Sequence, residues 1–130
     1  MPGVAAGAVE PRPFTLWFTG LSGAGKSTLA GESKQRLAMV GHACYVLDGD
    51  VLRTRLSSDL GFTPAHRSEN VRRVAEVCRL MNDADLIVIA ALISPNASDR
   101  ALARGIVGAG GFVEVHLDAD PAVCEQRVPQ

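Results

Sequence analysis

The sequence carries no excess of charge of either sign. Its 13 Lys and Arg residues stand against 14 Asp and Glu residues, which gives a formal net charge of −1 at pH 7. Domains that bind nucleic acid or acidic membrane surfaces are typically strongly basic. We therefore predict no nucleic-acid partner, and we expect any anionic ligand to be bound by a local cluster of cations.

Long apolar runs are also missing. The longest, LIVIAALI at residues 86–93, falls far short of the ~20 residues that a membrane-spanning helix needs. The first 13 residues, MPGVAAGAVEPRP, have neither the basic start nor the continuous apolar stretch of a signal peptide. We predict no membrane partner and a flexible tail over residues 1–13.

Cysteine is scarce, and its spacing does not suggest disulfide or metal-binding pairs. Cys44, Cys78 and Cys124 are odd in number, widely spaced and without a Cys-x-x-Cys pair. This favours reduced core cysteines of a cytoplasmic protein over a disulfide framework. A chain of 130 residues that is 47% hydrophobic is long enough for one sizeable core, so we expect a single domain over residues 14–130.

Short apolar runs alternate with segments of helical period. The runs are rich in β-branched and aromatic residues and predict strands at 14–19, 43–47, 86–91 and 112–117. Helices are predicted at 26–40, 64–83 and 96–107, the second with an apolar stripe at Val71, Val74, Ala75, Cys78 and Met81. Strands that alternate with helices predict an α/β fold, in which a parallel sheet is covered on both faces.

The most informative segment lies between the first strand and the first helix. GLSGAGKS at residues 20–27 fits the P-loop pattern G-x-x-x-x-G-K-[ST] in the context that the pattern requires. Its glycines allow backbone amides to point at phosphate oxygens, and the helix dipole favours the same anion. We expect Lys26 to bridge the terminal phosphates of ATP, Ser27 to bind Mg²⁺ and Thr28 to contact phosphate.

Two carboxylates follow the second strand, in YVLDGDVLR at residues 45–53. Asp48 and Asp50 lie at the carboxyl end of that strand, where open α/β sheets bind ligands. If a helix begins there, Asp50 and Arg53 share one face of it. Either aspartate could serve the reaction or simply cap the helix, and the sequence favours the functional role for Asp50 more than for Asp48.

Polar residues also lie at the start of the long helix. At about 100° per residue, Arg67 and Asn70 fall within roughly 60° of each other, close to the line of the apolar stripe. A charged residue on the buried side of a helix is costly unless it faces a cleft or a partner. We therefore expect Arg67 and Asn70 to contact an anionic ligand.

The remaining charges of this helix have a simpler interpretation. Arg72, Glu76 and Arg79 fall on the opposite side and predict a solvated face. Phe62 precedes the helix in a Gly-containing turn, where it could stack on a base or pack into the core.

Taken together, these motifs resemble one family. LWFTGLSGAGKST, LDGDVLR, DLGFTPAHRSENVRRVAEV and LISP, in this order and spacing, are similar to adenylylsulfate kinase, and the resemblance extends over residues 14–127. It implies a P-loop NTPase fold with three αβα layers. It also implies transfer of the ATP γ-phosphate to the 3′-hydroxyl of adenosine 5′-phosphosulfate, with Mg²⁺.

The resemblance further implies roles for individual residues. Those expected to bind ATP are Gly20, Leu21, Ser22, Gly23, Ala24, Gly25, Lys26, Ser27 and Thr28. Those expected to bind adenylylsulfate are Asp50, Arg53, Phe62, Arg67, Asn70, Ile93 and Ser94. It also implies a homodimer or an association with a sulfate adenylyltransferase.

This sequence departs from the family pattern at two places. The family continues past CEQR with a lysine-bearing lid, whereas this sequence reads CEQRVPQ at residues 124–130 and places Val128 where the family has Asp. Ala97 stands where the family usually has Arg. The domain is therefore expected to be short at its C-terminal end relative to the family. In the family, a closing lid excludes water and completes the charge clamp on the transferring phosphoryl group.

The favoured mechanism is direct in-line transfer. Phosphoryl transfer depends mainly on positioning and charge neutralisation. We expect Asp50 to accept the proton of the 3′-hydroxyl, Lys26 to neutralise phosphate charge, and Ser94 to hold the substrate without a covalent step, although the family convention marks this serine as a possible phosphoserine. A nucleotide-binding module without catalysis and a kinase for another small acceptor are the alternatives.

Overall fold

The computed structural model describes residues 12–20, 25–94 and 96–117. Its strands are β1 (Thr15–Gly20), β2 (Cys44–Asp48), β3 (Ile87–Ala91) and β4 (Phe112–Leu117). Its helices are α1 (Lys26–Met39), α2 (Gly49–Arg53), α3 (Pro64–Asp83) and α4 (Ala97–Val107), with a 3₁₀ turn, η1 (Ala109–Gly111), before the last strand.

The four described strands form one parallel sheet in the order β2-β3-β1-β4. The central strand β1 pairs with β3 on one side and β4 on the other, so that Trp17 lies opposite both Ala90 and Glu114. All five residues of β3 are buried, which is typical of a parallel strand covered on both faces. The predicted strand at 86–91 and the parallel sheet are thus confirmed.

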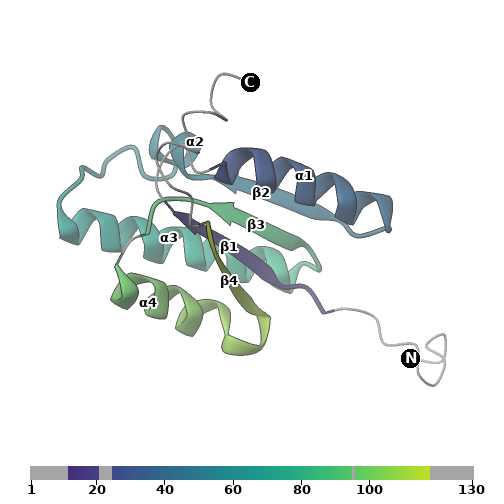
Figure 1. The fold of residues 1–130 in the computed structure, drawn as a ribbon. Coiled ribbons are helices and arrows are strands. Elements are labelled where there is room, and N and C mark those ends of the chain that lie inside the picture. The colour runs from purple at the N-terminus through teal and green to yellow at the C-terminus, as the bar shows by residue number, and fades with distance from the viewer. Residues whose placement is uncertain (1–11, 21–24, 95, 118–130) are drawn as a thin grey trace.

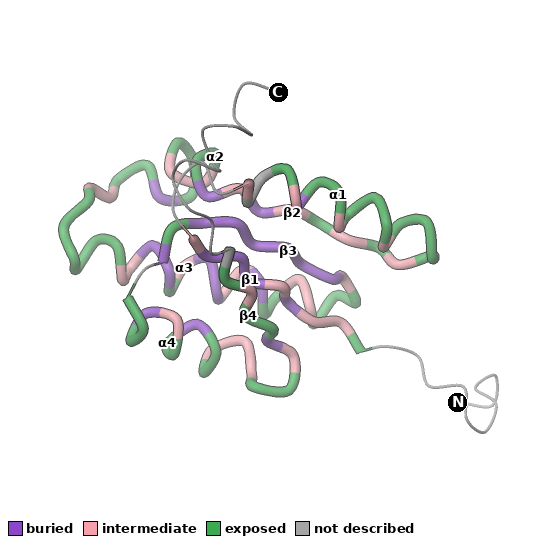
Figure 2. The backbone as a smooth tube through the Cα atoms, viewed as in Figure 1, coloured by how far each residue is buried: buried purple, intermediate pink, exposed green. Residues whose placement is uncertain are grey.

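Helices cover both faces of the sheet (Figure 1). On one face, α3 and α4 pack on side chains that include Trp17, Val88, Ala90 and Phe112. On the other face, α1 packs on Phe18, Ile89, Ala91 and the partly buried Leu16 and Val46. The adjacent residues of β1 point to opposite faces because side chains alternate along a strand. The three-layer arrangement predicted from the sequence is confirmed, and Figure 2 shows the largely buried central strands β1 and β3 between partly exposed helices.

Capping residues fix where three of the helices begin. The side chains of Asp48, Thr63 and Asn96 accept hydrogen bonds from backbone amides in the first turns of α2, α3 and α4. Pro64 occupies the first turn of α3, a position that needs no backbone donor. The N-cap of α1 is Gly25, and no described side chain caps that helix.

The predicted elements agree with the described ones to within one residue at each end. The long helix has the bounds expected, and its apolar stripe is buried at Val71, Val74, Ala75 and Cys78. The five residues of α2 are too few for a periodic pattern, and η1 was not predicted. Within the described part of the chain, no helix is long and apolar enough to cross a bilayer.

The two cysteines that the structure describes differ in burial. Cys78 in α3 is buried in the core, as predicted, whereas Cys44 in β2 is only half-buried; neither forms a disulfide within the described residues. Cys124, nearly all of the predicted tail and residues 118–130 lie outside the described residues.

Candidate functional site

The candidate site lies at the carboxyl ends of the strands. From β1 the chain enters α1 on one face of the sheet, and from β3 it enters α4 on the opposite face. Because β1 and β3 are neighbours, the connections diverge between them. Open α/β sheets bind ligands in the crevice at such a switch point, and α2 begins at the same end of the sheet (Figure 1).

The start of α1 presents backbone donors at this point. Gly20 at the end of β1 has φ 142° and Gly25 at the N-cap has φ 89°. Residues other than glycine rarely adopt these backbone conformations. No acidic residue lies in the first turn of α1, so the positive end of the helix dipole is not neutralised there. Residues 21–24 and the side chains of Lys26 and Ser27 lie outside the described part, and Thr28 is exposed.

The second loop joins β2 to α2. Asp48 accepts hydrogen bonds from the amides of Asp50 (2.9 Å) and Val51 (3.4 Å), so the capping alternative is confirmed for Asp48. The Asp50 side chain is exposed in the first turn of α2. A Cβ at Gly49 would lie 2.7 Å from Leu92 Cβ and 3.1 Å from the Ala91 carbonyl oxygen, which shows how closely this loop approaches the end of β3.

Arg53 organises the turn before α3. Its Nη1 donates to the Gly61 carbonyl oxygen at 2.7 Å, and its guanidinium lies 4.6 Å from the centre of the Phe62 ring. His66 Nδ1 accepts from the Gly61 amide at 2.7 Å. Phe62 is 70% exposed, so the core-packing alternative for this residue is wrong. One face of its ring carries a cation, and much of the ring is exposed to solvent.

Asn70 and Arg67 have different environments. Asn70 is only 4% exposed, and its Oδ1 has no hydrogen-bond partner among the described residues. A buried acceptor without a partner is costly, so this oxygen is available to a ligand. Arg67 was expected near the buried side, but it is exposed because the first turn of α3, residues 64–67, lies outside the core.

Ser94 and Ile93 follow β3. Ser94 is 2% exposed; its Oγ accepts a hydrogen bond from Trp17 Nε1 at 3.0 Å, and its carbonyl oxygen accepts one from Arg100 Nη1 at 2.8 Å. Ile93 is 54% exposed. The segment therefore has one side chain anchored in the protein and one directed to the surface.

The outer face of α3 is solvated, as the sequence predicts. Arg79 forms exposed ion pairs with Glu76 and Asp83. Hydrogen bonds from Arg72, which has the larger effect, and from Arg73 lower the pKa of the Glu69 carboxyl group to about 2. Arg73 also pairs with Asp59 at 2.7 Å, which ties α3 to the preceding loop.

Sequence reasoning did not find two polar links between elements. Ser68 donates to the buried Asp99 at 2.6 Å, and this bond joins α3 to α4. Arg100 pairs with Glu114 on β4 at 2.9 Å. The partners lie 31 and 14 residues apart in sequence, so no helical or strand period relates them.

Comparison with known proteins agrees with this geometry. The family model for adenylylsulphate kinase matches residues 12–130. The chain belongs to the adenylylsulfate kinase family. Among curated members, the adenylyl-sulfate kinase of Aeromonas salmonicida is 57% identical over 119 residues, which cover 92% of this chain and 61% of that protein. The chain thus spans about three fifths of the length of that relative.

Solved structures of the family share the fold. The Mycobacterium tuberculosis APS kinase in complex with AMPPNP and APS is 46% identical, with a TM-score of 0.84, and the match covers 93% of this chain and 71% of that one. A hexameric APS kinase from Thiobacillus denitrificans is 46% identical with a TM-score of 0.76, over 86% of this chain and 23% of that chain. These matches confirm the P-loop NTPase fold.

Proposed function

We propose that this chain is an adenylylsulfate kinase, which transfers the γ-phosphoryl group of ATP to the 3′-hydroxyl of adenosine 5′-phosphosulfate. The products are ADP and 3′-phosphoadenylylsulfate. The observation that carries this proposal is the start of α1, which no described side chain caps and which lies at the switch point of the sheet in a member of this family. Polar groups suited to an anionic acceptor lie on the neighbouring loops.

The described residues fit a Mg-nucleotide at this position. Gly20 and Gly25 have positive φ angles, which a tight turn around phosphate would use, and α1 offers amides with no described side-chain cap. Residues 20–28 would bind ATP, with Lys26 on the terminal phosphates and the Ser27 hydroxyl on Mg²⁺. When bound, the ion neutralises charge on the phosphate oxygens. No cluster of three or more His, Cys, Asp or Glu side chains that could hold a metal occurs within the described ranges.

The acceptor would bind beside this nucleotide. Asn70 supplies a buried oxygen that lacks a partner among the described residues, which suits a donor group on a purine or ribose. Phe62, held by Arg53, offers an exposed ring on which a base can stack. Arg67 would contact an anionic oxygen of the sulfate or phosphate, because it is exposed in the first turn of α3. Ile93 and Ser94 would complete the pocket.

Asp50 would act as the base. Its carboxylate is exposed at the carboxyl edge, whereas Asp48 is engaged in capping α2. The 3′-oxygen would attack the γ-phosphorus as its proton passes to Asp50, and the bond from that phosphorus to the β,γ-bridging oxygen would break to release ADP. Ser94 is a poor nucleophile here because its buried hydroxyl is bonded to an indole rather than to a base.

Calorimetry tests the two binding sites of this proposal. We expect Mg-AMPPNP to bind one site per chain, and Lys26→Ala to abolish that binding, because the change removes a charge-assisted contact to phosphate. Arg67→Ala should weaken adenylylsulfate binding by ~1.5–3 kcal/mol, the range for a hydrogen bond to a charged group. The matched control is Arg79→Ala, which removes an exposed arginine of the same helix and should change neither affinity.

Each alternative gives a different result in these titrations. A nucleotide-binding module without this acceptor site would bind Mg-AMPPNP but not adenylylsulfate. A kinase for another small acceptor would bind adenylylsulfate no better than it binds AMP. Equal effects of the Arg67 and Arg79 changes would mean that the acceptor does not contact the start of α3.

Compartment and assembly are part of the same proposal. The free thiols of Cys44 and Cys78 support a reducing compartment, for which we propose the cytoplasm. Homodimer formation or association with a sulfate adenylyltransferase stays a prediction, and sedimentation of the purified chain alone and with that enzyme would test it.

A further inference from the structure

Two side chains outside the predicted site hold one of its segments in place. We propose that Arg100 and Glu114 are positioning residues, which fix Ile93 and Ser94 in the conformation that binds adenylylsulfate. This inference rests on the proposed function, because it takes residues 93–94 to contact the acceptor.

Ser94 is held from two elements besides its own. Trp17 on β1 donates its indole proton to Ser94 Oγ at 3.0 Å, and Arg100 on α4 donates from Nη1 to the Ser94 carbonyl oxygen at 2.8 Å. Both the side chain and the backbone of this residue are therefore fixed. Ile93, the preceding residue, has an exposed side chain. Because the two residues are adjacent, the restraint on Ser94 also limits the conformations that Ile93 can adopt.

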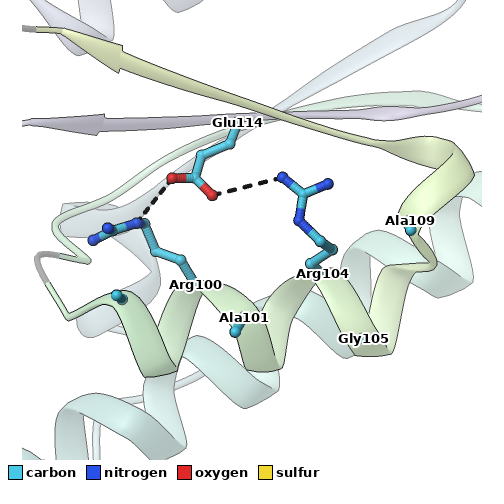
Figure 3. A pocket seen from close by; sticks show the side chains of 7 residues that line it. Arg100, Ala101, Arg104, Gly105, Ala109 and Glu114 are labelled. Carbon is cyan, nitrogen blue, oxygen red and sulfur yellow. Dashed lines mark hydrogen bonds and ion pairs between the residues drawn. The ribbon is translucent and has the colours of Figure 1, made fainter.

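Glu114 restrains the arginine in turn. Its Oε2 accepts from Arg100 Nε at 2.9 Å. Both side chains, with Arg104, line a groove between α4 and β4, and Figure 3 shows Arg100 and Glu114 reaching toward each other across it. The side chains of Arg100 and Glu114 are only 24% and 29% exposed. Charge-assisted bonds of this kind are stronger than those between neutral groups. The guanidinium thus connects β4 to the end of β3 through two different nitrogens.

Arg104 offers an internal comparison. It lies one helical turn after Arg100 and faces the same carboxylate, at 3.8 Å from Glu114 Oε1 (Figure 3). Its side chain is 44% exposed, and its described hydrogen bond goes to the Phe112 carbonyl oxygen rather than to Ser94. Loss of Arg104 therefore removes a charge from the groove but leaves the contact to Ser94 intact.

Loss of the Arg100 contact should weaken acceptor binding specifically. The Ser94 carbonyl would lose a donor, and the segment would sample conformations that must be ordered again on binding. If Ile93 and Ser94 must both be ordered again, the Kd of adenylylsulfate should rise about fivefold to 150-fold. The start of α1 is not part of this network, so nucleotide affinity should not change.

The experiment compares Arg100→Gln with Arg104→Gln in the full chain. Trp17 is the single tryptophan, and its indole donates a hydrogen bond to Ser94. Its fluorescence emission therefore reports whether Ser94 keeps its position before any ligand is added. We expect Arg100→Gln to change that emission and to raise the Kd of adenylylsulfate at least fivefold, with the Kd of Mg-AMPPNP within twofold of wild type. Arg104→Gln should leave both constants within twofold.

Two further variants keep the proposal open to refutation. If Arg100→Gln does not fold, Glu114→Gln should still raise the Kd of adenylylsulfate, and Arg100→Lys should give an intermediate value because one amine cannot make both contacts. Equal adenylylsulfate constants for the Arg100 and Arg104 variants would overturn the proposal. Failure of the wild type to bind adenylylsulfate would instead refute the proposed function, and unchanged Trp17 emission in Arg100→Gln would then also refute the hold on Ser94.

Discussion

A single substitution, Gly49→Ala, should both destabilise the protein and distort the candidate site. An added Cβ would lie 2.7 Å from Leu92 Cβ and 3.1 Å from both Leu92 Cα and the Ala91 carbonyl oxygen. Two of these three atoms belong to the backbone and cannot rotate away. Overpacking of this kind costs ~1–3 kcal/mol, and a site without room for relaxation belongs in the upper half of that range.

A smaller effect acts in the opposite direction. Replacing glycine by alanine restricts the unfolded chain and stabilises the folded state by ~0.4–1 kcal/mol where the conformation allows it. The net loss should therefore be about 1–2.6 kcal/mol in the free energy of unfolding. With a urea m-value of ~2 kcal/mol/M, the unfolding midpoint should fall by about 0.5–1.3 M.

The matched control is Gly31→Ala in α1, where nothing lies within 4 Å of the added Cβ. That variant should gain ~0.5–1 kcal/mol, because glycine is unfavourable within a helix. Urea unfolding of both variants measures the difference. Because Gly49 precedes Asp50 and contacts the segment before Ser94, phosphoryl transfer should also fall in folded Gly49→Ala. A midpoint equal to that of the wild type would refute the close approach of the β2–α2 junction to β3.

Three further results are expected. Burial raises the pKa of the Cys78 thiol to about 12, so an alkylating reagent should modify this thiol only after unfolding. The half-buried Cys44 should react in the native protein. Modification of Cys78 in the native protein, detected by mass spectrometry, would contradict this. The pKa of Glu69 is lowered from 4.5 to about 2, so its contribution to stability is present above pH 4.5 and is lost as the pH falls toward 2. Glu69→Gln should flatten the stability curve in that window, and an unchanged slope would mean that its two arginine partners do not hold the carboxylate in solution. Asn70→Leu should leave stability unchanged or raise it by about 1 kcal/mol, since the buried oxygen has no described partner, while adenylylsulfate binding is lost; a loss of stability would indicate a structural role.

Local features made most of the fold predictable. The apolar stripe of α3, Pro64 in its first turn and the buried run of β3 each determine an element from its own residues. The strand order was not predicted, because crossover connections in a parallel sheet can place a strand on either side of its predecessor. Its observed order puts β1 beside β3, and this adjacency creates the switch point at which ligands bind in open α/β sheets.

The site was predictable where the residues of one short motif determine the backbone conformation that the chemistry needs. The glycines around residues 20–25 indicate a phosphate loop without knowledge of the rest of the molecule. Helical period placed Arg67 and Asn70 near one face, yet it could not show that the first turn of α3 leaves the core and exposes Arg67. The link from Glu114 through Arg100 to Ser94 joins three elements, so only the tertiary structure reveals it.

The most direct test of the central claim is a phosphoryl-transfer assay on the purified chain. The chain is incubated with Mg²⁺, ATP labelled at the γ-phosphate and adenylylsulfate, and the labelled products are separated and identified by mass spectrometry. We expect the label in 3′-phosphoadenylylsulfate, no label on Ser94, and no product from Lys26→Ala. Absence of labelled 3′-phosphoadenylylsulfate from the folded wild type would contradict the proposed function, and label on Ser94 that passes into product at the turnover rate would contradict direct transfer.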